Sequence, residues 1–315
     1  MVARNLLAEP RSAGNEETCS PLVATFPSED YAAVSAAAAA AVLASTTEVE
    51  EGNVPPWRSD DEHASEMRFD IISSLSVVSG PGNSGQRFVH LQFTIDTDIG
   101  KEEFARGVTA FWRRIVAEPD DFPSEFWQLF LQSSLTALGE KCRPVCVGIT
   151  RRRLITAGAM RQWRPRLEED NRELRQFGVA VPKGVEHVGL RAPTMQETGN
   201  CLVITDCSNA FSGVKMAAVL AEAANFVPAL TPLAAKCYSI ALTDAFFRMD
   251  SGKTRTTACS SGVQRGDPMD PAMFFPGVAT GAEAFQREVR GRRIESLRVH
   301  GRCLSRPYGG HGQHR

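Results

Sequence analysis

The distribution of apolar residues in the first half of the chain predicts a strand hairpin followed by two helices. Residues 69–78 and 88–95 are rich in β-branched and aromatic side chains, and a Gly-Pro-Gly-Asn turn sequence lies between them. From residue 101 to 138 the apolar side chains recur at helical spacing, and Pro119 and Pro123 divide this run in two. These elements form an N-terminal extension, residues 67–134, in which the sequence shows no candidate chemistry.

The second half of the chain alternates between helical and strand-like patterns. A helix is expected to begin at Arg151. Another is expected over 185–195, where Pro193 predicts an early end because a proline inside a helix removes a hydrogen bond. An apolar run at 202–205 indicates a buried strand. The remaining predicted elements are two helices and a hairpin, at 217–224, 232–249 and 247–259.

Residues 1–66 lack this periodicity and are rich in acidic residues and alanine, which favours a flexible arm. Within them, Ala32 to Ala44 has the composition of a helix but is too short for a membrane span. No secretory signal pattern is present, so we expect a nuclear or cytoplasmic protein that does not enter a membrane. The eight cysteines are scattered without metal-ligand spacing, and reduced thiols are expected.

Charge is unevenly distributed along the chain. Residues 1–100 carry 5 basic and 15 acidic side chains, whereas residues 141–315 carry 26 basic and 15 acidic ones, although the net charge of the whole chain is only −2. A basic C-terminal half suits a polyanionic partner such as nucleic acid. Arginines that merely solvate helix faces would give the same counts, so charge alone leaves both interpretations open.

Two short stretches carry the candidate chemistry. In the first, LVITDCSNAF from Leu202 to Phe211, the carboxylate of Asp206 follows the apolar strand, a position from which it can enter a cleft and hold Mg²⁺. In the second, SSGVQRGDP from Ser260 to Pro268, glycines let the backbone approach a neighbour and Asp267-Pro268 begins a helix. Taken alone, each stretch is also explained as a turn followed by a helix cap.

In this order, the two stretches resemble the palm of a reverse transcriptase, in particular that of site-specific non-LTR retrotransposons of the kinetoplastid type. The family pattern is Asp-x-Ser-Asn-Ala-Phe, then Gly-x-x-Gln-Gly-Asp-Pro. A third stretch, Arg143-Pro144-Val145-Cys146-Val147 with Arg153-Leu154-Ile155, is similar to the fingers motif of the family. The resemblance covers residues 135–290. It implies an α+β fold, with fingers at 135–200 and a partial palm at 201–290 of a right-hand polymerase.

The activity that this resemblance implies is RNA-directed DNA synthesis, with an RNA template, a DNA primer, deoxynucleoside triphosphates and Mg²⁺ or Mn²⁺. Asp206 would be the catalytic, metal-binding carboxylate. Phe211 would lie under the sugar and exclude a 2′-hydroxyl, although core packing is the ordinary explanation for a phenylalanine. The other implied contacts are to the nucleotide from Gln264, Arg265, Gly266 and Arg153, and to the nucleic-acid backbone from Arg143, Arg151 and Arg152. A solvated basic helix face explains Arg151 to Arg153 without any ligand.

One part of the family pattern is missing. A reverse transcriptase carries a second carboxylate pair on a Tyr/Phe-x-Asp-Asp hairpin, and two-metal chemistry needs those carboxylates. No aspartate follows Asp270, itself at a position where glycine is common in the family, and residues 291–315 form a basic tail without a strand pattern. The sequence therefore predicts a truncated or degenerate, catalytically inactive copy, whose incomplete palm lacks the catalytic hairpin and the thumb. The alternative is a non-catalytic remnant that binds RNA or DNA.

Overall fold

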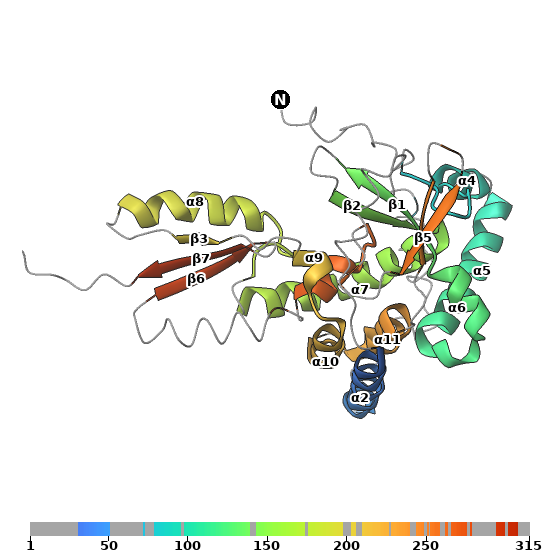
Figure 1. Cartoon of the computed structure of the whole chain (residues 1–315), viewed down its shortest axis with the longest axis horizontal. Coiled ribbons are helices and arrows are strands. Elements are labelled where there is room, and N and C mark those ends of the chain that lie inside the picture. Colours follow the sequence, from blue (N-terminus) through green and yellow to red (C-terminus); the bar gives the residue numbers. More distant parts are fainter. Residues whose placement is uncertain are drawn as a thin grey trace, which may run out of the picture.

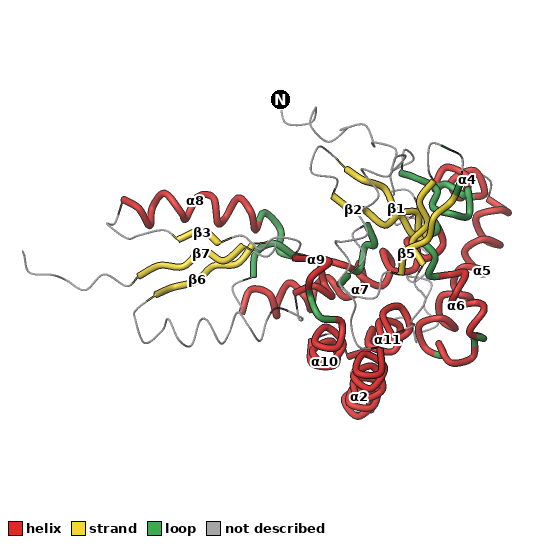
Figure 2. The backbone as a smooth tube through the Cα atoms, viewed as in Figure 1, coloured by secondary structure: helices red, strands yellow, loops and turns green. Residues whose placement is uncertain are grey.

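The computed structural model describes residues 31–50, 72, 79–95, 98–138, 143–173, 176–197, 203–205, 210–226, 228–239, 244–248, 251, 253–258, 262–263, 266–275, 278, 294–299 and 302–307. These residues form an α+β fold in which helices are combined with one four-stranded and one three-stranded sheet (Figures 1 and 2). The two sheets lie at opposite ends of the molecule, and the long helix α7, Thr150–Glu173, runs between them (Figure 1).

The four-stranded sheet is built from two hairpins. β1, Ser133–Leu138, pairs antiparallel with β2, Arg143–Gly148, and β4, Asp244–Arg248, pairs antiparallel with β5, Thr254–Ala258. β1 and β4 are parallel neighbours, so the strand order is β2-β1-β4-β5. The predicted hairpin at 247–259 is thereby confirmed.

The three-stranded sheet brings the C-terminal part of the chain beside the Asp206 stretch. β3, Val203–Thr205, confirms the predicted strand and pairs antiparallel with β7, Arg302–Pro307, which pairs in turn with β6, Ile294–Val299. Helix α8, Gly184–Glu197, contacts β6 (Figure 1). The expectation that the tail has no strand pattern is therefore wrong. The sequence of the tail alternates only weakly, and pairing with β3 supplies the hydrogen-bond partners that its backbone requires.

Besides α7 and α8, the described residues form further helices. They are α2 Tyr31–Glu50, α4 Phe88–Thr94, α5 Asp98–Ala117, η3 Pro119–Asp121, α6 Ser124–Phe130, α9 Ala210–Gly213, α10 Met216–Phe226, η4 Pro228–Leu230, α11 Thr231–Ser239 and a last helix at 270–275. The core runs through α5, α7, α10 and α11, with fully buried side chains such as Ile115, Ile155, Leu220 and Leu233. Around α6, the rings of Phe111, Phe122, Phe126, Trp127 and Phe130 pack edge to face or stacked.

Helix α2 corrects the expectation of a flexible arm for its part of residues 1–66. Val34, Ala38 and Ala41 are buried, and their spacing of four and three residues places them on one face of the helix. That face packs against α10 and α11. Small side chains allow this close approach, and the helical composition of Ala32 to Ala44 agrees with the helix observed. The other residues of the predicted arm lie outside the described residues.

Three further predictions of secondary structure are wrong, because the side chains that the fold buries have a different spacing from the one that the sequence suggested. Residues 88–94 form α4 rather than a strand, because Phe88 and Leu91 are buried together at helical spacing. Of its predicted partner strand, 69–78, the described part includes Ile72, which has helical backbone. Leu135, expected at the end of a second helix, lies in β1 opposite Cys146. The helix expected over 232–249 ends at Ser239, and Ala245 and Phe247 are buried at the two-residue spacing of strand β4.

The expected early end of the helix at Pro193 is also wrong, since α8 continues to Glu197. Pro193 and Gly189, four residues before it, are both exposed. The carbonyl group of Gly189, which a proline leaves without its helical donor, therefore lies where water reaches it.

A glycine contact on α7 gives a direct test of the core. A Cβ atom at Gly158 would lie 1.8 Å from Cη2 of Trp112, whereas one at Gly107 would meet nothing within 4 Å. We expect Gly158→Ala to lower the free energy of unfolding by about 1–3 kcal/mol despite the better helix propensity of alanine. The matched Gly107→Ala should raise it by up to about 1 kcal/mol. Urea denaturation followed by tryptophan fluorescence measures both, and equal effects would contradict the packing described.

Candidate functional site

The two palm-like stretches of the sequence contact each other directly. The backbone N–H of Val263 donates to the carbonyl of Phe211 at 2.9 Å, and that of Gly262 donates to Val214 at 3.1 Å. Gly262 has φ +71°, and a Cβ atom there would lie 2.4 Å from the Phe211 carbonyl oxygen. Glycine is required here both for the left-handed backbone and for the close approach of the two segments.

Phe211 joins the first of these stretches to the helix at 270–275. Its ring stacks on that of Phe274, with centroids 4.4 Å apart and planes 22° from parallel. Phe274 is buried and Phe211 is half-buried, so one face of the Phe211 ring is used in packing. The role of Phe211 as a sugar gate stays a prediction.

The fingers-like stretch meets the second palm-like stretch at Gly266. Gly266 has φ +115°, and a Cβ atom there would lie 2.6 Å from the carbonyl oxygen of Cys146 in β2. Any other residue would push the turn away from the strand. Gly266 is exposed on its other side, so its implied contact with a nucleotide stays a prediction.

A buried ion pair connects the same two stretches. Nε of Arg152, in the first turn of α7, lies 2.7 Å from Oδ2 of Asp267, and both side chains are almost completely buried. Nη1 of Arg152 donates to the carbonyl of Leu131 at the end of α6, at 3.1 Å. Burial lowers the pKa of Arg152, but Asp267, together with Cys237, Tyr238 and Asp270, outweighs burial and raises that pKa above its ordinary value. Arg152 therefore remains charged and holds α6, α7 and the 266–275 segment together.

Asp267 and Asp270 organise the start of the last helix. Oδ1 of Asp267 accepts a hydrogen bond from the N–H of Met269 at 3.0 Å, which closes a turn, and the helix itself begins at Asp270, three residues after the predicted start. Oδ2 of Asp270 accepts from the N–H of Asp267 at 3.0 Å, and Oδ1 accepts from the Tyr238 hydroxyl at 3.1 Å. Burial, and then the nearby Asp267 carboxylate, raise the pKa of Asp270 well above its ordinary value.

Two neighbours on α11 complete this polar cluster. Burial raises the pKa of the Cys237 thiol to about 12, so the thiol stays protonated and poorly nucleophilic at neutral pH. Burial, followed by Asp270, also raises the pKa of Tyr238 well above its ordinary value. The cluster of Arg152, Asp267, Asp270, Tyr238 and Cys237 is closed to solvent, which indicates that it positions segments rather than reacts.

The structure separates the three consecutive arginines of α7. Arg151 is exposed, Arg152 is fully buried and Arg153 is 5% exposed. The Arg153 guanidinium lies 4.7 Å from the Phe88 ring centroid and donates to Ser79 Oγ and the Gly80 carbonyl. Burial lowers the pKa of Arg153, against the opposing effect of Asp267.

Two of the implied contacts are thereby corrected. Arg152 is not placed to contact a template backbone, and Arg153 is not placed to contact a triphosphate, because packing and internal hydrogen bonds occupy both guanidinium groups. Helical residues are about 100° apart, so three successive side chains cannot share one face. Arg151 remains available at the surface. Asp206, Gln264 and Arg265 lie outside the described residues, as does the side chain of Arg143 at the start of β2.

The described residues do not fit a two-metal site. They contain no group of three or more histidine, cysteine, aspartate or glutamate side chains able to hold an ion. The carboxylates of Asp267 and Asp270, which lie where the three stretches meet, are both engaged by protein donors. The described hairpin β6–β7, which pairs with β3, carries Glu295 as its only acidic residue.

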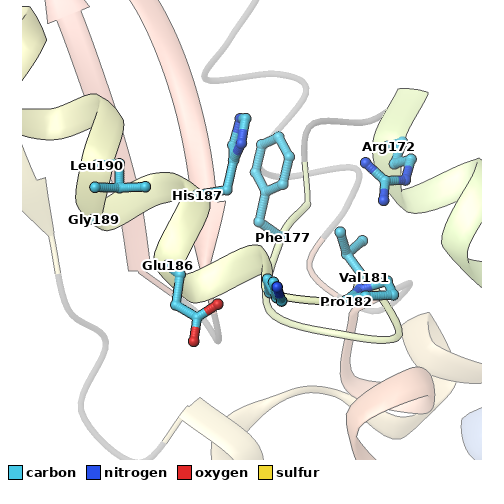
Figure 3. A pocket seen from close by; sticks show the side chains of 9 residues that line it. Arg172, Phe177, Val181, Pro182, Glu186, His187, Gly189 and Leu190 are labelled. Carbon is cyan, nitrogen blue, oxygen red and sulfur yellow. The ribbon is translucent and has the colours of Figure 1, made fainter.

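Sequence reasoning did not identify the partners of the polar cluster or a groove near α8. Asp270, three residues after the predicted helix start at Asp267, was a usable signal, because this spacing returns a side chain to the first turn. Cys237 and Tyr238 gave none. The groove is lined by Arg172, Phe177, Lys183 and His187, among others (Figure 3). Its only signal in the sequence was the loop FGVAVPKG, from Phe177 to Gly184.

Comparison with known proteins does not assign the chain to a family. No family model matches the sequence, and no curated protein matches it. In the part of the chain that the structure describes, no helix combines the length and apolar character needed to cross a membrane.

The buried ion pair predicts strong coupling between its partners. Arg152→Met leaves Asp267 buried without its counter-charge. Asp267→Asn leaves Arg152 buried without its counter-charge but keeps an acceptor for the N–H of Met269. Each should lower the free energy of unfolding by about 3–5 kcal/mol, and the double variant by clearly less than the sum. The control is Arg106→Met, from the exposed pair with Glu103, which should cost less than about 1 kcal/mol. Additive effects in chemical denaturation would contradict a direct interaction.

Asp270 predicts a particular pH dependence of stability. Its pKa is raised in the folded state, so the folded protein holds this proton more tightly than the unfolded chain does. Its favourable contribution is complete below the ordinary pKa of 3.8 and is lost as the pH rises through the folded-state value. Relative to Asp270→Asn, the free energy of unfolding of the wild type should therefore fall as the pH rises above the ordinary carboxyl pKa of 3.8. Denaturation curves across that range measure the difference, and a difference that is flat or rises would refute the assignment.

Proposed function

We propose that the chain is a reverse-transcriptase-family polypeptide of a retrotransposon, comprising fingers and part of a palm. The family activity is RNA-directed DNA synthesis from an RNA template, a DNA primer and deoxynucleoside triphosphates. We further propose that these 315 residues do not polymerise on their own, because they contain no aspartate after Asp270 to provide the second carboxylate pair.

The observation that carries the proposal is the meeting of three stretches that are far apart in the sequence. Gly262 and Val263 contact Phe211 and Val214, Gly266 contacts Cys146, and Asp267 pairs with Arg152. Val263–Phe211 and Gly266–Cys146 join residues of the motifs on which the resemblance rests, and Arg152 and Val214 lie within three residues of those motifs. Three unrelated turn-and-cap segments would have no reason to meet in this way, so their contact supports a common origin with fingers and palm.

A non-catalytic nucleic-acid-binding remnant is the second candidate, and the surface of α7 favours it. This helix exposes Arg151, Arg161 and Arg164, while the arginine that a polymerase would use near its substrate, Arg153, is buried. Guanidinium groups pair well with phosphate oxygens, and several on one helix produce salt-sensitive binding to a polyanion. Both candidates share this binding, and synthesis that depends on Asp206 would exclude the second.

Binding to single-stranded RNA should weaken steeply with salt. Replacing both Arg151 and Arg164 by glutamine should reduce the slope of log affinity against log salt by about 1.4, since each phosphate contact contributes about 0.7 on a single strand. Arg106→Gln, which removes an exposed charge from α5, should leave the slope unchanged. Fluorescence anisotropy across a salt series measures this. Binding that is absent or insensitive to salt would overturn the proposal.

Primer extension on an RNA template with Mg²⁺ or Mn²⁺ tests whether the chain is catalytically inactive. We expect no extension by the wild type or by Asp206→Ala, and equal RNA binding by both. Extension by the wild type that Asp206→Ala abolishes would show that the chain is catalytic and would exclude the remnant. Extension that survives the substitution would indicate a contaminating polymerase.

A further inference from the structure

An open groove of about 700 Å³ lies between the end of α7, the loop that follows and the start of α8, away from the contacts described above (Figure 3). Its lining includes Arg172, Phe177, Pro182, Lys183, His187 and Leu190. We propose that this groove binds single-stranded nucleic acid by stacking one base between Phe177 and Arg172, with Lys183 contacting the adjoining phosphate. The inference rests on the proposed nucleic-acid binding and assigns it a second place on the chain.

Phe177 presents an aromatic surface in a fixed orientation. His187 stacks on one face of its ring, with centroids 4.9 Å apart and planes 26° from parallel. The Arg172 side chain lies on the other side of Phe177, across the groove (Figure 3). An aromatic ring supported on one face and open on the other is a stacking platform, which accepts any base because every base has a π-face.

Arg172 supplies a planar and charged second wall. Its Nε and Nη2 atoms lie 3.1 and 2.8 Å from Oε1 of Glu168, which orients the guanidinium group. The side chain is nevertheless 54% exposed, so the flat faces of the group remain accessible. A guanidinium plane stacks on bases as an aromatic ring does, and its charge also attracts the phosphate backbone.

The loop that carries Phe177 and Lys183 is held rigidly. Asn171, buried in α7, donates from Nδ2 to the Val179 carbonyl at 3.0 Å, and the Gln176 side chain accepts from the N–H of Gly178 at 2.7 Å. Lys183 has φ +55°, a left-handed backbone conformation that residues other than glycine seldom adopt. Such strain persists where the surrounding contacts impose it, and it concentrates at binding sites.

Charge and shape favour a strand over other ligands. Lys183 and Arg172 are the basic residues of the lining, and the side chain of Glu186 points away from the Phe177 ring (Figure 3). The groove is open rather than enclosed, so a polynucleotide can continue past it in both directions. A free nucleotide would be held by few contacts in such a site.

The test compares binding of the full chain to three labelled oligomers of about 12 units, namely oligo(rA), oligo(dA) and an abasic strand of equal length and charge. Phe177→Leu and Arg172→Lys should each weaken binding of both adenylate strands by about five- to 100-fold and leave binding of the abasic strand unchanged. Lys183→Asn should weaken binding of all three, because asparagine tolerates the backbone conformation but removes the charge.

Matched controls are Phe93→Leu, an exposed phenylalanine of α4, and Arg166→Lys, an ion-paired arginine of α7. Neither should change the affinity for any strand, and thermal melting of all variants checks that they fold. If the wild type binds RNA but Phe177→Leu and Arg172→Lys bind adenylate as tightly, the groove inference is wrong while the proposed function stands. An equal loss of abasic binding would indicate a structural role and would also overturn the inference. If the wild type binds none of the three strands, both proposals fail.

Discussion

The buried pair of Arg152 and Asp267 is the interaction on which the centre of the structure depends. Removing two charges from water is costly, and the cost is offset because the pair is close and because Nη1 of Arg152 and Oδ1 of Asp267 have further partners in Leu131 and Met269. An exposed pair would tolerate changes of angle and distance, whereas this one does not. It therefore sets the position of the turn at Gly266 against strand β2, and with it the helix that supports Phe211.

The buried polar cluster around this pair is better suited to holding segments together than to reacting with a substrate. Asp270 is enclosed by Tyr238 and a backbone amide, and the Cys237 thiol remains protonated because it is buried. Groups that act on a substrate must be accessible to it, and these are not. Any contact of the chain with nucleic acid is therefore expected from exposed groups, such as Arg151 at the start of α7 and the rings and cations of the groove between the end of α7 and the start of α8.

The hairpin β6–β7 changes how the missing carboxylate pair is understood. The sequence suggested a palm without its central hairpin, but the structure pairs a hairpin with β3, the strand that precedes Asp206. Main-chain hydrogen bonding requires only a paired edge and is indifferent to side-chain chemistry. A sheet can thus form whichever side chains its strands carry, so the pairing with β3 defines part of a fold and does not define an activity.

By itself, the sequence determined the local features that depend on a few neighbouring residues. Examples are strand β3, the hairpin at 247–259, the start of α7 and the turn at Asp267, and the charge asymmetry follows from counting. Tertiary structure decided what depends on which face is buried. Residues 88–94 became a helix, the alanine-rich segment joined the core, and Arg151 to Arg153 acquired three different environments. Burial is a property of contacts between distant segments, and these contacts override the preferences of a short stretch.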